Sequence, residues 1–240
     1  MVSKDEKEEA INKRIKELID SFEEYTSSFK REDPFSGPSE YFYIKLIKEQ
    51  RNIDYNSLFN REFIELLYAT LASWGMHRMG PKEKGAKMNN FEGFEKCLLN
   101  NKELFIDLKS YRIEKINLED PEIIEKIKRL YFGLNSLMQS NSKLVATTKI
   151  MHFLLPHLIP PMDREYTMKF FRESLPTIKK ESDREEEYEI FKSILKKMAE
   201  ISKKVNCKLD NEFSPSIPKA IDNAIVYWGI KNKRLRSSQK

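Results

Sequence analysis

The stretch Phe63-Ile-Glu-Leu-Leu-Tyr-Ala-Thr-Leu-Ala-Ser-Trp74 decides the fold. Apolar side chains would occupy nearly every turn of a helix built from it, so little of that helix could face solvent. We therefore expect a helix over residues 62–74 at the centre of the molecule. It should stop at Gly75, because residues 75–85 contain three glycines and Pro81, which favour a loop.

The rest of the chain also has the apolar periodicity of helices. Residues 4–30 predict one long amphipathic helix, since Ile11, Ile15 and Leu18 recur at three- and four-residue intervals. Further helices are expected at residues 39–50, 90–100, 102–109, 121–133, 143–155, 164–173, 183–204 and 218–229. No internal repeat is present, and no alternating stretch indicates a β-strand. The sequence therefore predicts an all-α fold.

Length and composition place the chain among globular proteins. It has 240 residues, 40% of them hydrophobic and 34% charged, and this apolar content excludes a disordered chain. The length suits a single all-α domain over residues 1–240, which could consist of two tightly packed helical lobes.

Several classes of protein are excluded by features that the sequence lacks. Cys97 and Cys207 form no Cys-x-x-Cys pair, so nothing indicates a disulfide framework or a zinc site, and an iron–sulfur cluster would need four cysteines. The most apolar run, residues 150–161, is broken by two histidines and a proline and is too short to cross a bilayer. The first residues contain no apolar signal region. We expect a cytoplasmic protein with no membrane contact, metal or organic cofactor.

Positive charge is concentrated in two segments. The net charge is only +5, but residues 78–87 hold four cations against one acid, and residues 231–240 hold five cations and no acid. The second segment is expected to be a basic, flexible tail. A basic segment is usually no more than solvated surface. Because this chain has two of them, nucleic acid is retained as a candidate partner. The sequence does not indicate an oligomeric state.

Two stretches resemble the helix-hairpin-helix DNA glycosylases, the superfamily of endonuclease III and 8-oxoguanine glycosylase. Residues 63–74 are similar to an early core helix of that family, and Leu137-Met-Gln-Ser-Asn-Ser-Lys143 stands where the family has its hairpin. The resemblance covers residues 60–175. It implies a two-lobed helical fold with a cleft between the helices at residues 62–74 and 143–155. The activity it implies is excision of a damaged base from DNA, with or without an additional lyase activity.

The hairpin segment departs from the family pattern at two positions. Gln139 and Asn141 replace the glycines that let backbone N–H groups approach a phosphate closely. Two interpretations therefore stay open. One is a divergent glycosylase, and the other is a non-catalytic helical protein that keeps the fold and binds nucleic acid or a protein partner.

The resemblance also implies catalytic residues. In the family, a lysine at the end of the hairpin attacks the sugar, and an aspartate at the start of a later helix stabilises the developing charge. The corresponding residues here are Lys143 and Asp163, and Lys149 on the same helix as Lys143 is a competing nucleophile. A lysine nucleophile requires a lowered pKa. Each residue also has a structural interpretation, Asp163 as a helix N-cap and Lys143 as a surface lysine.

A further group of residues is predicted to bind nucleic acid. Residues 74–80 combine an aromatic ring, a histidine, an arginine and glycines, which suits stacking on a base and holding a phosphate. His152 lies on the same helical face as Lys149, and it is either part of a polar stripe or a core histidine. In the last helix, Lys219, Asp222 and Asn223 are candidates to line the same cleft. The predicted binding residues are Trp74, His77, Arg78, Lys82, Lys87, Asn141, Ser142, His152 and Arg164.

Overall fold

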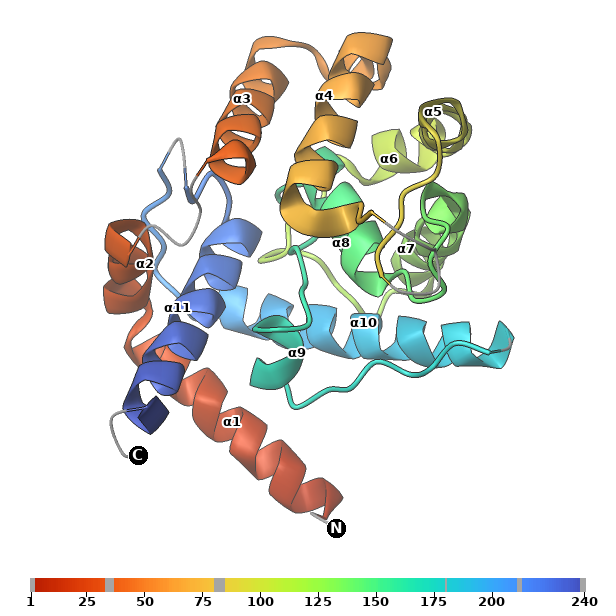
Figure 1. Ribbon diagram of the computed structural model, residues 1–240. Helices are drawn as coiled ribbons and strands as arrows, with labels where there is room; N and C mark the ends of the chain where they lie inside the picture. The colour runs from red at the N-terminus through yellow and green to blue at the C-terminus, as the bar shows by residue number, and fades with distance from the viewer. Residues whose placement is uncertain (1–2, 33–36, 80–84, 180, 211–212, 238–240) are drawn as a thin grey trace.

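The computed structural model describes residues 3–32, 37–79, 85–179, 181–210 and 213–237, and their regular structure is helical (Figure 1). Within these residues, extended segments pair only at an isolated bridge between Met88 and Met138. The all-α prediction is confirmed, and none of the described helices is long and apolar enough to span a membrane. The helices are α1 (Lys4–Asp20), α2 (Phe22–Glu32), α3 (Pro38–Asn52), α4 (Arg61–Leu71), α5 (Phe91–Asn100), α6 (Lys102–Leu108), α7 (Pro121–Gly133), α8 (Leu144–Leu154), α9 (Thr167–Phe170), α10 (Glu181–Ser202) and α11 (Ile217–Ser237), with short helical turns η1 (Tyr55–Phe59), η2 (Ala72–Met76) and η4 (Leu134–Leu137).

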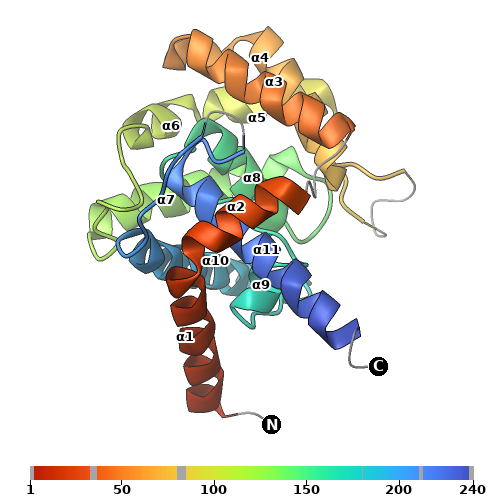
Figure 2. The same ribbon diagram turned by 90° about the vertical axis from the view of Figure 1, so that its left-hand side faces the viewer.

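The predicted helix at residues 4–30 is two helices in the structure. Ser21 separates α1 from α2, and its φ of −109° and ψ of 17° are not helical. The bend lets Phe22 and Tyr25 enter the core, where the Tyr25 ring lies 5.4 Å from that of Tyr227 on α11. In Figure 2, α2 crosses over α11 while α1 runs away from it toward the N-terminus. A periodic pattern continues through such a bend, so the sequence did not reveal it.

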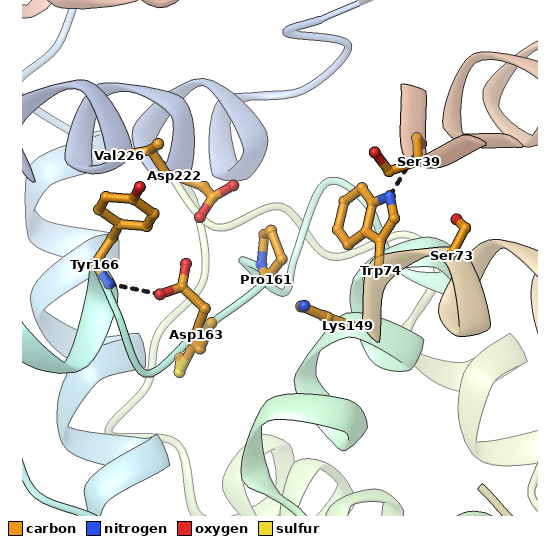
Figure 3. Close-up of a pocket in the computed structure, with 10 residues that line it drawn as sticks. Ser39, Ser73, Trp74, Lys149, Pro161, Asp163, Tyr166, Asp222 and Val226 are labelled. Carbon is orange, nitrogen blue, oxygen red and sulfur yellow. Dashed lines mark hydrogen bonds between the residues drawn. The ribbon is translucent and has the colours of Figure 1, made fainter. Parts of the chain in front are cut away.

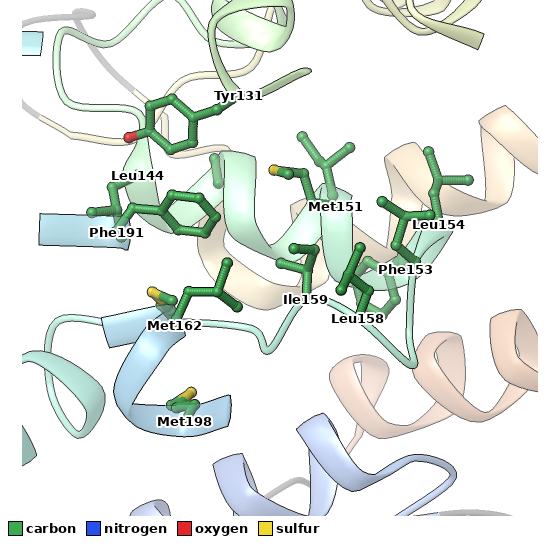
Figure 4. Close-up of a cluster of buried hydrophobic side chains, with 14 of the residues drawn as sticks. Tyr131, Leu144, Met151, Phe153, Leu154, Leu158, Ile159, Met162, Phe191 and Met198 are labelled. Carbon is green, nitrogen blue, oxygen red and sulfur yellow. The ribbon is translucent and has the colours of Figure 1, made fainter. Parts of the chain in front are cut away.

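One hydrophobic cluster joins helices from both ends of the chain. α3 packs beside α4, and α2 packs across α11 (Figures 1 and 2). α8 is the most deeply buried helix of the site region, with nine of its 11 residues buried. Figure 4 shows its side chains in one cluster with Tyr131 of α7 and with Phe191 and Met198 of α10. Close packing of this kind holds the polar side chains of α8 in fixed positions.

α4 leads into the site through a change of helical form. The Asn60 side chain caps its start, accepting a hydrogen bond from the Phe63 N–H at 2.8 Å. After Leu71 the chain continues as η2, a π-helical turn in which Gly75 takes φ 76° and ψ 19°. This left-handed conformation favours glycine. The regular α-helix therefore ends at Leu71, before the end predicted at residue 74, and the π-helical turn that continues it is broken at Gly75. This turn brings Trp74 to the edge of a cavity.

The segment after the double proline forms a shorter helix than predicted. The sequence predicts a helix over residues 164–173, whereas α9 covers only Thr167–Phe170. The Asp163 carboxylate accepts a hydrogen bond from the Tyr166 N–H, and the Asp163 carbonyl accepts one from the Met168 N–H. These bonds close a wide turn in place of the first helical turn. Arg172, at φ 54°, follows the end of α9.

The last helix is longer than predicted. The sequence predicts its end at residue 229, but α11 continues to Ser237, so residues 231–237 of the predicted tail are helical. Residues 238–240 lie outside the described residues. Gly229 lies against the ring of Tyr166, since a Cβ added to it would stand 2.5 Å from Tyr166 Cδ1. The missing side chain therefore lets the segment before α9 approach α11 closely.

Candidate functional site

A cavity of about 270 Å³ lies where η2, α8, the segment at residues 161–166 and α11 meet (Figure 3). We call it the inner cavity. A wider space of about 610 Å³, which we call the groove, adjoins it. Ligand sites in proteins typically span about 300–1,000 Å³, so the two spaces together have the size of a binding site. They share four lining residues, Trp74, Lys149, Asp163 and Tyr166.

Lys149 presents its amine to the inner cavity from the buried helix α8. Its Nζ lies 5.2 Å from the centre of the Trp74 ring. This amine forms no hydrogen bond or ion pair with any of the described residues. Burial lowers the pKa of Lys149, the carboxylates of Asp163 and Asp222 oppose this shift, and the Lys219 ammonium adds to it. The net lowering increases the fraction of neutral, nucleophilic amine.

Asp163 closes the turn before α9 and also lines the cavity with its carboxylate, so it is not the helix N-cap that the sequence predicts. Its Oδ1 accepts a hydrogen bond from the Tyr166 N–H at 2.6 Å, while its own N–H donates to Thr167 Oγ1 at 3.2 Å. Its Oδ2 accepts no hydrogen bond from the described residues. The preceding residue, Met162, is tied to α8 through its N–H, which donates to Thr148 Oγ1 at 3.3 Å. This bond fixes the Asp163 segment relative to α8, which carries Lys149.

Trp74 is a wall of the cavity and also a packed core residue. Its Nε1–H donates to the Ser39 carbonyl at 3.2 Å, and its ring contacts those of Tyr43 and Phe153 at centroid distances of 5.5 and 5.1 Å. The Nζ atoms of Lys149 and Lys219 lie over the ring, 5.2 and 5.6 Å from its centre. The Lys219 ammonium, which is held in an ion pair, stabilises the indole in one orientation.

α11 contributes a buried ion pair behind the cavity. Lys219 Nζ donates to Asp222 Oδ2 at 2.6 Å, and both side chains are almost fully buried. Burial raises the pKa of Asp222, the Lys219 ammonium opposes this rise, and Asp163 adds to it. Of the three candidates on this helix, Asp222 lines the inner cavity, whereas the Asn223 side chain donates away from it to the Phe213 carbonyl at 2.7 Å.

Tyr166 is a lining residue that the sequence interpretation missed. It stands across the cavity from Trp74 and close to Asp163 and Val226 (Figure 3). Tyrosine at the third position after an aspartate carries no signal by itself. The glycine at position 229, unusual inside a helix, was the available hint that a large side chain packs against α11.

Lys143, the other candidate nucleophile, lines neither the inner cavity nor the groove. Its ammonium points back along the chain and donates to the carbonyls of Asn135 and Met138, the latter at 2.7 Å. Burial and the neighbouring Arg184 lower its pKa to about 8. It is a buried lysine that satisfies the carbonyls following α7, in contrast to the surface lysine expected.

The start of α8 is occupied by a carboxylate from α10. Glu187 Oε1 accepts hydrogen bonds from Ser142 Oγ at 2.6 Å and from the backbone N–H groups of Lys143 and Leu144 at 3.1 and 3.3 Å. The family resemblance assigns hairpin N–H groups to a phosphate. Here the N–H groups of Lys143 and Leu144 bind Glu187, so they are not free to bind DNA. Ser142 and Asn141 still line the groove.

His152 lies in the core and not at the site. It is fully buried, and its Nδ1 is 2.8 Å from the Ile159 carbonyl. Burial lowers its pKa to about 3, so the ring is neutral. The predicted role of His152 in binding is therefore corrected to one in packing.

The remaining predicted binding residues fall into three groups. Arg78 and Arg164 line the groove and are exposed. His77 is exposed but lines neither space, and Lys87 contributes its backbone carbonyl to a hydrogen bond from the Gln139 N–H at 2.7 Å. Lys82 lies outside the described residues. The structure therefore brings Lys149, Asp163 and Trp74 together and adds two arginines at the rim.

The described part of the chain contains no group of three or more His, Cys, Asp or Glu side chains placed to hold a metal ion. Comparison of the chain with protein-family models, with curated proteins and with solved structures finds no match.

Proposed function

We propose that this protein is a DNA glycosylase with lyase activity, in which Lys149 is the nucleophile. One observation carries the proposal: an amine without a bonding partner among the described residues, on a buried helix, shares a cavity with the Asp163 carboxylate. The cavity lies beside α4 and α8, the two helices that flank the cleft expected from the family resemblance. The glycosylase-like architecture is part of the proposal.

The chemistry uses the neutral form of the amine. Lys149 attacks the sugar carbon C1′, the bond from C1′ to the base breaks, and the base leaves with the electron pair and takes up a proton. The carboxylate of Asp163 stabilises the positive charge that develops on the sugar. Loss of the amine's protons and opening of the sugar ring then give an imine between Lys149 and C1′.

The dimensions suit one nucleotide turned out of a duplex. The inner cavity of about 270 Å³ is bounded by the flat side chains of Trp74 and Tyr166. Turning out a base costs a few kcal/mol, which contacts to the DNA backbone must offset. Arg78 and Arg164 stand at the groove where such contacts would form.

Borohydride trapping on a duplex with an abasic site tests the proposal, because borohydride reduces an imine to a stable covalent adduct. We expect the natural protein to give an adduct and Lys149→Gln to give none. Lys143→Gln is the matched control: it removes a nearby buried lysine that lies outside the cavity and should still give the adduct. Asp163→Asn should slow adduct formation by about 10- to 1,000-fold.

Two results would contradict the assignment. If Lys149→Gln forms the adduct as well as the natural protein, another amine reacts. If neither the natural protein nor Lys143→Gln forms an adduct, the amine mechanism is wrong.

The non-catalytic alternative has one observation in its favour. The N–H groups of Lys143 and Leu144, at the start of α8, donate hydrogen bonds to the Glu187 carboxylate. These bonds within the protein replace the contact with a DNA phosphate that the resemblance implies for the hairpin. A protein that only binds nucleic acid would shift a labelled duplex in a salt-dependent way but would give no adduct. The trapping experiment, run beside a binding titration, separates the two functions.

A further inference from the structure

A second cavity, of about 300 Å³, lies at the C-terminal end of α8 and shares no lining residue with the inner cavity or the groove. Its walls come from the end of α3, from η1, from the residues that follow α6, from the end of α8 with the residues after it, and from Pro215. Its volume is at the lower end of the range typical of sites for small molecules. The proposed function does not use it.

The walls of the second cavity are tied together by hydrogen bonds that need no ligand. The Gln50 side chain on α3 donates to the Phe153 carbonyl at 2.8 Å, and the Tyr55 hydroxyl in η1 donates to the Leu154 carbonyl at 2.9 Å. Both bonds connect another wall to the end of α8. A preformed site loses less conformational entropy when a ligand binds.

The lining of the second cavity is largely apolar. Five of its residues are buried aliphatic side chains, and Tyr55, Tyr111 and His157 add aromatic rings. Burial and the Arg112 guanidinium lower the pKa of His157, and the Glu114 carboxylate opposes this shift, so the imidazole is neutral near pH 7. These side chains suit the apolar body of a ligand.

The charged side chains of the lining are all positive. Among the described residues that line the second cavity, only Arg51 and Lys109 are charged, and none is acidic. Both side chains are exposed, and Lys109 Nζ lies 5.2 Å from the centre of the Tyr55 ring. Guanidinium and ammonium groups form charge-assisted hydrogen bonds with carboxylate and phosphate oxygens. Two cations beside an apolar lining therefore favour an anion with an apolar body.

We propose that the second cavity binds a small organic anion, which consists of an apolar body and one carboxylate or phosphate group. The body lies against the aliphatic and aromatic side chains, and the anionic group is held by Lys109 and Arg51. This site is independent of the proposed function, because no residue of the inner cavity takes part in it.

An NMR titration with three probes tests the proposal. The probes are 2-naphthoate, 2-naphthyl phosphate and the uncharged 2-naphthamide, which share one ring system and differ in the head group. We expect at least one anion to bind with a Kd of about 0.1–1 mM, and the amide to bind about tenfold more weakly. The tighter of the two anions identifies the head group. The chain has three histidines, and the ring signals of His157 should shift while those of the exposed His77 should not.

Variants assign the binding to the two cations. Lys109→Gln with Arg51→Gln should weaken binding of the anion about 10- to 25-fold, and Lys109→Gln alone about fivefold. Neither should change binding of the amide. The control is Lys48→Gln with Lys115→Gln, which removes the same charge from two exposed lysines outside the cavity and should bind the anion as the natural protein does.

Four results would overturn the proposal. They are the absence of binding by both anions, equal binding of the amide and the anions, equal binding by the natural protein and the Lys109–Arg51 double variant, and displacement of the bound anion by duplex DNA. The last result would assign the two cations to nucleic acid. None of these results bears on the Lys149 adduct, so failure of this inference is distinguishable from failure of the proposed function.

Discussion

Two buried lysines on neighbouring turns of the chain have different chemical environments. Lys143 donates to two backbone carbonyls, which stabilise its ammonium form even though burial and Arg184 lower its pKa to about 8. Lys149 has no such acceptors among the described residues. Burial therefore lowers its pKa, and only the more distant carboxylates of Asp163 and Asp222 oppose this shift. The environment of each side chain, and not its position relative to the hairpin, decides which amine can act as a nucleophile.

His152 predicts a pH dependence of stability. Its pKa is lowered from 6.5 to about 3 in the folded protein, so between these values the unfolded chain binds a proton that the folded chain does not. Its stabilising contribution is therefore present above pH 6.5 and is lost as the pH falls below that value. The loss should reach about 2 kcal/mol at pH 5.

Urea denaturation at pH 7.5 and pH 5 checks this. His152→Leu removes the titrating ring, so the decrease in unfolding free energy between the two pH values should be about 2 kcal/mol smaller than in the natural protein. His77→Ala, which changes an exposed histidine, should retain the full decrease. An equal decrease in all three proteins would show that His152 is not the responsible group.

At the scale of elements, the site depends on contacts between helices that are far apart in sequence. Glu187 of α10 holds the first turn of α8, Thr148 of α8 holds the Asp163 segment, and Gly229 of α11 admits Tyr166. The last two contacts each join two of the elements that form the cavity, and the first joins α8 to α10 behind it. Disturbing any one of them should therefore affect the site without touching Lys149 or Asp163.

Removal of the Glu187 carboxylate should destabilise the start of α8. Glu187→Ala leaves the Ser142 hydroxyl and the N–H groups of Lys143 and Leu144 without their acceptor, at a cost of about 1–3 kcal/mol in unfolding free energy. The control is Glu186→Ala, at the preceding, exposed position of α10. Chemical denaturation measures both, and a similar small effect for the two variants would argue against the capping role.

Gly229→Ala should show a conflict between helix formation and packing. Alanine normally stabilises a helix interior by about 1 kcal/mol over glycine. Here its Cβ would lie 2.5 Å from Tyr166 Cδ1, so the ring must move. We expect no gain in thermal stability and slower adduct formation. In a Tyr166→Ala background the same change should stabilise the protein, and a gain of equal size in both backgrounds would contradict the packing conflict.

At the scale of the whole molecule, charge is distributed so that cations border the groove without dominating the surface. The net charge is +5, and Arg78 and Arg164 line the groove together with the acids Asp163 and Glu165. Such a surface gives moderate electrostatic attraction to a polyanion. Binding to DNA should therefore depend on salt through a small number of phosphate contacts.

Fluorescence anisotropy with a labelled duplex at 50–200 mM salt measures this dependence. Arg78→Ala and Arg164→Ala should each weaken binding and reduce the slope of log affinity against log salt by about 1. Lys126→Ala, on α7 and bonded to Glu122 at 2.8 Å, should change neither. No binding at 50 mM salt would exclude a DNA partner at this groove.

The sequence predicted features that depend on nearby residues. Apolar periodicity located most of the helices, Asn and Asp residues such as Asp120 mark helix starts, and Gly75 marks a break. The hydrogen bond from the Tyr166 N–H to the Asp163 carboxylate spans only three residues and is local in the same way, although it closes a turn before α9 and does not cap the helix that the sequence predicts there. These interactions are local, so the order of residues is enough to specify them.

The tertiary structure decided the bend at Ser21, the length of α11 and, above all, the composition of the site. Lys149 was one of two candidate lysines in the sequence, Asp222 one of three polar residues on an apolar helix, and Tyr166 had no distinguishing pattern. Their meeting depends on packing among α4, α8, α11 and the segment after the double proline. Burial and the electric field at a side chain are produced by residues distant in the chain. Only the folded molecule brings those residues together.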